Sequence, residues 1–220
     1  MSRPRLSRLP SRANAGRDRG GKRGEHIHHG YWPTPESKAA ESKETAQVNL
    51  INLLLARSQL PDGARVLDVG CGVGGTTRHL ASALGCAVTG LTISGRQVEL
   101  ATRLTKTAAA AAAAKEAGGA VAAPDADGFF ALGRGRVRFV ELDAEKMGDF
   151  FGNTASDRLF DAVWISEALS HFPNKALFFA NAARLLRPGG RLVLADWFRA
   201  EGLRDEEMVA DIKPIEGRFP

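Results

Sequence analysis

The segment Val66-Leu67-Asp68-Val69-Gly70-Cys71-Gly72-Val73-Gly74-Gly75 decides the fold of this chain. Its apolar first half predicts a buried strand, which runs through an acidic residue directly into a glycine-rich turn. Glycine has no Cβ, so such a turn can adopt unusual backbone angles and let a ligand lie against the main chain. A strand, a turn of this kind and a helix form the nucleotide-binding end of a doubly wound α/β domain.

The positive charge of the chain is concentrated near its start. The net charge is +5 over 220 residues, and residues 1–24 contribute +7, because they hold eight basic residues and one acid, Asp18. This segment is rich in Arg, Ser, Gly and Pro, so we expect a disordered basic tail and no nucleic-acid-binding domain. It also resembles a mitochondrial transit peptide, although Pro and Gly interrupt a long amphipathic helix. We therefore expect a cytoplasmic protein, with a mitochondrial location as the alternative.

The rest of the composition is that of one globular domain, expected over residues 25–220. Hydrophobic residues make up 44% of the chain and charged residues 25%, and no apolar run is long enough to span a membrane. The two cysteines, Cys71 and Cys86, form neither a disulfide framework nor a metal-ligand spacing. That usage fits a reducing compartment.

Apolar periodicity predicts strands that alternate with helices, which indicates a Rossmann-like, doubly wound and mostly parallel sheet. A low-complexity insertion at about 107–135 is expected to extend one helix and then form a flexible surface segment without chemistry. The expected strands are 64–69, 87–91, 136–142, 159–165 and 191–196, and the expected helices are 36–58, 76–84, 95–105, 174–186 and 205–212.

The glycine loop fits two patterns. Gly70, Gly72 and Gly75 satisfy the dinucleotide fingerprint G-x-G-x-x-G, whereas Asp68 followed by Gly70, Gly72 and Gly74 fits D-x-G-x-G-x-G, the pattern of S-adenosylmethionine (SAM) enzymes. A dinucleotide site needs an acid for the ribose about 20 residues further on. The second strand ends Gly90-Leu91-Thr92-Ile93-Ser94, without an acid, which disfavours NAD.

Further motifs follow this loop in a fixed order. They are the Gly90–Ser94 segment with Gln97, then Glu141-Leu142-Asp143-Ala144, Phe160-Asp161-Ala162-Val163-Trp164 and Leu185-Leu186-Arg187-Pro188-Gly189-Gly190. With them the chain resembles the class I SAM-dependent methyltransferases. Within that superfamily it is similar to the tocopherol, sterol and ubiquinone-pathway methyltransferases, and more remotely to cyclopropane-fatty-acid synthases.

The resemblance implies SAM as cofactor and assigns residues to it. Thr92, Ser94 and Gln97 would replace the usual ribose acid, and Asp143 would bind the adenine amino group, although it could also simply cap a turn. The implied cofactor-binding residues are Tyr31, Trp32, Asp68, Gly70, Cys71, Gly72, Gly74, Thr92, Ile93, Ser94, Gln97, Asp143, Ala144 and Ser166.

The catalytic candidates are His171, as a base, and Glu167, at the mouth where donor and acceptor meet. Both could equally be structural or solvent-exposed residues. The cluster His26-Ile27-His28-His29-Gly30-Tyr31-Trp32 lacks the acids or cysteines of a metal site, so no metal is expected. The resemblance implies instead that this segment folds over the cofactor.

The expected reaction is SN2 methyl transfer to a small, partly apolar acceptor; O-, N-, C- and S-methylation all remain open. Only 24 residues follow Asp196, so the last two strands of the usual seven are expected to be missing. An exposed sheet edge would follow, and it could pair with another copy. The alternatives are a non-catalytic SAM-binding partner subunit and, more weakly, an NAD-dependent oxidoreductase.

Overall fold

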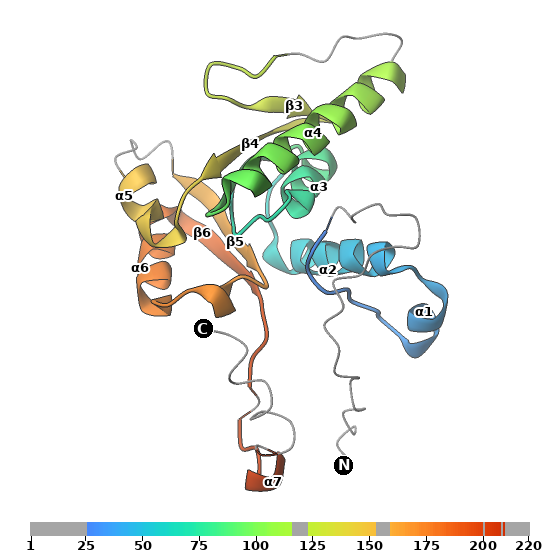
Figure 1. The fold of residues 1–220 in the computed structure, drawn as a ribbon, viewed down its shortest axis with the longest axis vertical. Helices are drawn as coiled ribbons and strands as arrows, with labels where there is room; N and C mark the ends of the chain where they lie inside the picture. Colours follow the sequence, from blue (N-terminus) through green and yellow to red (C-terminus); the bar gives the residue numbers. More distant parts are fainter. Residues whose placement is uncertain (1–25, 116–122, 153–158, 200, 208, 210–220) are drawn as a thin grey trace.

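The computed structural model describes residues 26–115, 123–152, 159–199, 201–207 and 209 (Figure 1). The predicted tail over 1–24 lies outside these residues. The described strands form one six-stranded sheet in the order β3-β4-β2-β1-β5-β6, in which every neighbouring pair is parallel except β3 and β4. The strands are β1 (Arg65–Val69), β2 (Ala87–Thr92), β3 (Phe130–Leu132), β4 (Gly135–Glu141), β5 (Phe160–Ser166) and β6 (Leu186–Ala195). The predicted α/β sheet is confirmed.

Helices cover both faces of this sheet (Figure 1). One face carries α2 (Lys43–Ser58), α3 (Gly75–Leu84) and α4 (Gly95–Lys115), and the other carries α5 (Met147–Phe151) and α6 (Lys175–Leu185). The short helix α1 (Pro35–Ala40) precedes α2, and α7 (Asp205–Glu207) lies on the segment that leaves β6. Short 3-10 turns, η1 (Ala144–Lys146) and η3 (Leu169–His171), follow β4 and β5.

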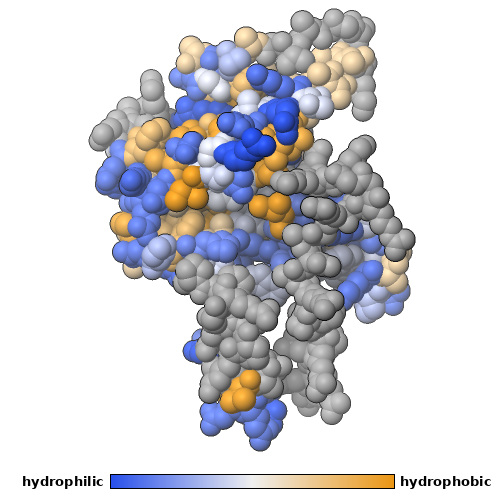
Figure 2. All heavy atoms as spheres, in the orientation of Figure 1, coloured by the Kyte–Doolittle hydropathy of each residue, from blue (hydrophilic) through white to orange (hydrophobic). Residues whose placement is uncertain are grey.

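The central strand β1 explains the two-layered core. Its side chains alternate between the faces, so Val66 packs with the cluster under α2 and α3, whereas Leu67 and Val69 pack with the cluster under α5 and α6. All three side chains are fully buried. Because β1 is buried on both sides from Val66 onward, that part of the strand is a continuous apolar run interrupted only by Asp68. In Figure 2 hydrophobic side chains gather over the middle of one face, and hydrophilic ones predominate around α7.

The helix predicted over 36–58 is wrong in one respect, because the structure divides it into α1 and α2. Thr34 and Ser37 form a capping box at the start of α1, and the Ser42 side chain accepts a hydrogen bond from the Thr45 N–H at the start of α2. The two caps end one helix and begin the next within a few residues. The predicted helix over 205–212 is described only in part, as α7, and α5 was not predicted.

The insertion is more regular than the sequence suggested. Helix α4 runs on to Lys115, as expected, but the segment after residue 122 contains β3, which pairs antiparallel with β4. The Asp125 carboxylate accepts the N–H groups of Asp127 and Phe129, and the guanidinium of Arg136 lies 4.5 Å from the Phe129 ring centroid. These local contacts order a segment that was expected to be flexible; residues 116–122 lie outside the description.

Strand β6 is the outer strand of the described sheet. A bulge lies between Phe160 and Ala162 where β5 pairs with it, and the Arg187 guanidinium forms an ion pair with Asp161 beside that bulge. Among the described residues no strand lies beyond β6. None of the described helices combines the length and the hydrophobicity that a membrane crossing requires.

Candidate active site

The glycine loop forms the floor of the site at the carboxyl end of β1. Gly70 and Gly72 have φ angles of 74° and 55°, a region that L side chains rarely adopt. A Cβ on Gly70 would lie 2.5 Å from Ala168 Cβ, and one on Gly72 would lie 2.5 Å from Ile27 Cδ1. The loop is held from below, because the N–H groups of Gly70 and Cys71 both donate to the Leu91 carbonyl oxygen at 2.9 Å. Only glycine therefore allows the close approach that the loop makes.

A first cavity of about 470 Å³ opens above this floor. It collects side chains from the ends of β2, β4 and β5 and from the loops that follow them, as expected where parallel strands end at one edge of a sheet. Its lining residues are Ile27, Gly70, Gly72, Leu91, Thr92, Ile93, Gln97, Leu142, Asp143, Ala144, Glu145, Glu167, Ala168, His171, Phe172 and Pro173.

One end of the first cavity combines polar groups with apolar walls. The Thr92 hydroxyl donates to Gln97 Oε1, and Asp143 Oδ1 accepts the Glu145 N–H at 2.9 Å. Asp143 therefore caps η1 and also lines the cavity, so its capping of a turn is compatible with the predicted binding of the adenine amino group. Ile93 is 74% exposed and lines the cavity, which leaves an apolar surface open to a ligand.

A second cavity of about 310 Å³ adjoins the first and shares Ile27, Gly70, Glu167 and His171 with it. Its other lining residues include His26, His28, His29, Asp68, Cys71, Ser166, Ser170 and Trp197. The residues common to both cavities mark the junction at which two bound molecules could meet.

Asp68 is a buried carboxylate in the wall of the second cavity. It is only 2% exposed, and its Oδ2 accepts a hydrogen bond from the Thr77 hydroxyl at 2.6 Å. Burial raises the pKa of Asp68 to about 6, and the hydrogen bonds from Thr77 oppose that shift. Burial also raises the pKa of the neighbouring Cys71 thiol, which keeps it protonated and unsuited to nucleophilic chemistry. A cation bound in the second cavity would offset the cost of burying the charged form of Asp68.

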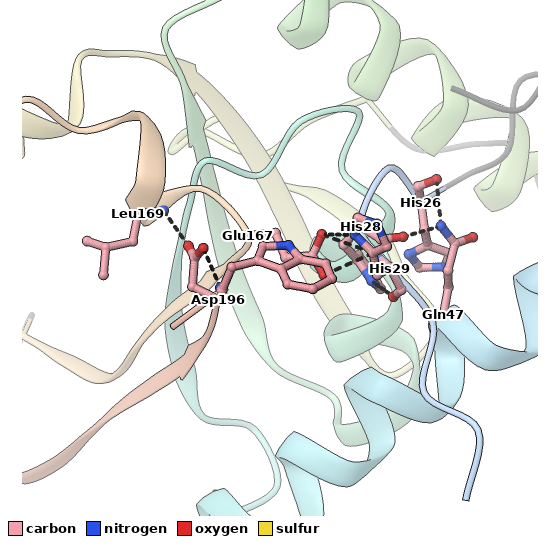
Figure 3. Close-up of polar contacts among 8 residues, drawn as sticks. His26, His28, His29, Gln47, Glu167, Leu169 and Asp196 are labelled. Carbon is pink, nitrogen blue, oxygen red and sulfur yellow. Dashed lines mark hydrogen bonds and ion pairs between the residues drawn. The ribbon is translucent and has the colours of Figure 1, made fainter. Parts of the chain in front are cut away.

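The segment His26–Trp32, called the strap below, meets the glycine loop where Ile27 lies against Gly72. Figure 3 shows three of its histidines, His26, His28 and His29, beside Gln47 and Glu167. The strap is anchored from α2 by Gln47, which is 1% exposed and donates through Nε2 to the carbonyl oxygens of His26 and His28. His28 is itself buried, and burial lowers its pKa. The resemblance predicted that this segment folds over the site, and the structure places its first four residues there.

Glu167 joins the strap to the end of β5. The Nδ1 atom of His29 lies 2.6 Å from Glu167 Oε2, and the backbone N–H of His29 donates to both carboxylate oxygens at 3.1 Å (Figure 3). Glu167 has a φ angle of 52°, which is unusual for a residue with a side chain. Its own N–H donates to the Ala195 carbonyl oxygen at 2.7 Å.

The loop after β5 is held by Asp196, at the end of β6. Asp196 Oδ2 accepts the Leu169 N–H at 2.8 Å, and Oδ1 accepts the Trp197 N–H. The His171 N–H donates to the Ala168 carbonyl oxygen and closes η3. His171 lines both cavities, as does Glu167, so the two catalytic candidates lie together at the junction.

Four of the sequence-predicted site residues line neither cavity: Tyr31, Trp32, Gly74 and Ser94. The Tyr31 N–H donates to Ala46, and a Cβ on Gly74 would press on the Phe139 ring. Ser94 caps α4 through Gln97. The remaining predicted residues do line one cavity or the other. Within the described ranges, no group of three metal-ligating side chains converges.

Sequence reasoning missed His29, Asp196 and Trp197. The first was seen only as part of a histidine cluster, whose partner Glu167 lies 138 positions away. Trp197 follows directly after Asp196, and its ring centroid lies 4.8 Å from that of His29 in an edge-on arrangement. An aromatic residue just past the last predicted strand was the available signal.

The comparison with protein families matches residues 67–194 to a family described as a methyltransferase domain. That range runs from β1 to β6 and contains the glycine loop and most of the first cavity. The chain belongs to the SAM-dependent methyltransferases. The family expected from the ordered motifs is confirmed.

Two relatives show where this methyltransferase domain falls within the family. It is 34% identical over 177 residues to 2-methyl-6-phytyl-1,4-hydroquinone methyltransferase of Synechocystis sp., covering 79% of this chain and 45% of the relative. It is 31% identical over 179 residues to a probable chloroplastic tocopherol O-methyltransferase of Oryza sativa, covering 79% and 41%. The chain thus spans about half the length of the curated relatives it matches.

A solved structure supports the fold of the methyltransferase domain. The putative sarcosine dimethylglycine methyltransferase from Galdieria sulphuraria superposes with a TM-score of 0.63 at 22% identity, over 90% of this chain and 62% of that one. At that identity the similarity concerns the fold alone.

Proposed function

We propose that the protein binds SAM across the two cavities and transfers its methyl group to a small, partly apolar acceptor. The observation that carries this proposal is the side-chain-free floor of Gly70 and Gly72 beneath a cavity of about 470 Å³, with polar groups at one end and a buried carboxylate beyond the other. An extended ligand with an adenosine end and an amino-acid end fits that distribution of groups.

Residues of both cavities would suit the cofactor. Asp143, Thr92 and Gln97 would hold the adenosine end in the first cavity, with Ile93, Leu142 and Ala144 as its apolar walls. Asp68 would face the ammonium group from the second cavity, while the strap would cover the ligand and exclude water. When bound, SAM supplies an electrophilic methyl group that is already activated.

The acceptor would meet the methyl group at the junction. Phe172 and Pro173 give the first cavity an apolar wall there, and Glu167 and His171 give it polar groups. We propose that both residues serve the acceptor, His171 by contacting and aligning it and Glu167 by holding the strap beside it. Replacement of His171 by Ala is then expected to lower turnover more than SAM affinity, and equal losses of both would count against this role.

Transfer can be tested directly with methyl-labelled SAM and a set of small phenols, hydroquinones and amines. Label in any product supports the methyltransferase activity. A chain that binds SAM but labels none of them would support the alternative of a SAM-binding partner subunit. The NAD-dependent alternative has no support in the comparisons or at the end of β2, where Thr92 stands.

Three further proposals concern the whole protein. We propose that residues 25–220 form the methyltransferase domain behind a basic tail, and that the protein works in the cytoplasm, with a mitochondrial location as the alternative. Tagging the chain with and without residues 1–24 tests both locations.

The third proposal is that two copies of the chain pair through the outer strand β6. The exposed side chains of Leu192, Trp197 and Phe198 favour this pairing. Light scattering on the full chain would show a monomer if that is wrong.

A further inference from the structure

The strap brings one imidazole and one carboxylate together beside the junction, because Glu167 lines both cavities and His29 lines the second. His29 donates its backbone N–H to both oxygens of Glu167 and places Nδ1 2.6 Å from Oε2 (Figure 3). The Glu167 side chain is 17% exposed, whereas that of His29 is 64% exposed. The carboxylate is thus held inside and the imidazole lies on its open side.

This contact determines which nitrogen of His29 carries a proton. A carboxylate accepts hydrogen bonds and cannot donate one, so the short contact requires a proton on Nδ1. In the neutral imidazole the lone pair then lies on Nε2. A neutral imidazole with a fixed Nε2 lone pair is the form that a proton acceptor needs.

The surroundings hold both partners in place. Glu167 occupies the left-handed region of φ and is tied to β6 by the hydrogen bond from its N–H to Ala195. Unfavourable backbone angles are retained where the surrounding structure imposes them, and they cluster at functional sites. The Trp197 ring packs edge-on against the His29 ring, and Trp197 is positioned in turn by Asp196. The imidazole is therefore restrained on two sides.

Building on the proposed methyl transfer, we propose that His29 is the base for an acceptor hydroxyl group and that Glu167 is its positioning residue. As the bond between the sulfur and the methyl carbon breaks, the bond between that carbon and the acceptor oxygen forms. The hydroxyl proton passes to His29 Nε2 and leaves later to solvent. This assigns the acceptor to the hydroxyl-bearing class, phenols above all, because their methylation requires the loss of that proton. His171 then orients the acceptor without taking its proton.

The tautomer can be measured without any turnover. Nitrogen NMR of the full chain, with selectively labelled histidine, distinguishes a protonated Nδ1 from a protonated Nε2. We expect the Nδ1-protonated form for His29, and its loss in the Glu167→Gln variant, whose amide no longer holds Nδ1–H as a carboxylate does. A mixture of tautomers in the unaltered chain would overturn the assignment.

The base is tested by turnover of hexylphenol, hexylhydroquinone and the matched hexylaniline. We expect the His29→Gly variant to lose about 100-fold in turnover of the phenols while its SAM affinity falls far less, because the backbone N–H that joins the strap to Glu167 remains. Added imidazole should restore part of the loss, because the site is open to solvent. The control is His79→Asn, on α3, which contacts Asn52 and lines neither cavity; it should behave like the unaltered chain.

Each other outcome has a definite meaning. If His171→Gly is rescued by imidazole and His29→Gly is not, or if His29→Gly loses SAM affinity and turnover equally, His29 is not the base. Turnover of hexylaniline alone would overturn the hydroxyl assignment and leave the methyltransferase activity intact. Failure of the unaltered chain to bind SAM would instead overturn the proposed function itself.

Discussion

The Thr77 hydroxyl donates to Asp68 Oδ2 across 2.6 Å and thereby ties the carboxyl end of β1 to the first turn of α3. Both residues are buried, so the carboxylate has little access to water. A charge in such a place is costly in the ligand-free protein and useful once a cation is bound. The contact therefore links the stability of the domain to the occupation of its site.

We expect Asp68→Asn to weaken SAM binding and to stabilise the ligand-free domain. Burial raises the folded-state pKa to about 6, so the folded state holds the proton more tightly than the unfolded chain does. The protonated Asp68 therefore stabilises the folded state. This contribution to the free energy of unfolding is at its full size below the ordinary carboxyl pKa, and it is lost as the pH rises through about 6. Near pH 8 the uncharged amide should then be favoured by on the order of 2 kcal/mol. Urea unfolding at pH 5 and pH 8 measures this difference, and an equal or lower stability of the variant at pH 8 would contradict it.

The Gly72→Val variant should lose SAM affinity sharply. Its side chain would meet Ile27 of the strap and would also impose an unfavourable φ angle, worth about 1–2 kcal/mol. Gly63 offers a matched control, because it too has a positive φ angle but its Cβ would meet nothing within 4 Å. Calorimetry should show that Gly63→Ala lowers stability and leaves affinity intact. Unchanged affinity in both Gly72→Val and Asp68→Asn would mean that the loop is not the cofactor site.

Loss of the strap anchor should accelerate release of the cofactor. Gln47→Leu keeps the volume of the buried side chain but removes both hydrogen bonds to the strap, each worth about 1 kcal/mol. Hydrogen exchange should speed up at residues 26–32, and stopped-flow measurements should show faster SAM dissociation. Asn52→Ala, an exposed change on the same helix, serves as the control. Unaltered exchange in the strap of the Gln47 variant would show that the anchor lies elsewhere.

The docked strap should weaken in mild acid. Burial, assisted by the nearby charges of His28, His79 and Arg78, lowers the pKa of His26 to about 4, below the ordinary value of 6.5. The docked strap therefore favours the neutral form of His26. The free energy that this neutral form contributes to docking of the strap is at its full size above pH 6.5, and it is lost as the pH falls toward 4. Because His26 is partly exposed, we discount this effect and expect the hydrogen-exchange protection factors of the strap amides to fall roughly tenfold between pH 7 and pH 5. The His26→Gln variant should lose this pH dependence of strap protection. If the protection still falls with pH in the variant, another titrating group causes it.

The sequence predicted the sheet because its signals are local, and for the same reason it placed most of the proposed SAM-binding residues on the walls of the two cavities. The motif around Asp68 and Gly70 carries its strand, its turn and its cavity-lining residues within ten residues, and the terminal polar residues of the other strands share one sheet edge. The contact between His29 and Glu167 could not be found in this way, since it joins residues 138 positions apart through the docking of the strap. Strand β3 was missed because its three residues gain their order from pairing with β4.

The central claim is that the glycine floor and the cavity above it bind SAM. The most direct test is calorimetric titration of the full chain with SAM, and separately with NAD, beside the Gly72→Val variant. We predict that one SAM molecule binds per chain, that the variant abolishes or greatly weakens this binding, and that NAD gives no binding heat. Absence of SAM binding to the unaltered chain, or binding of NAD in its place, would contradict the account.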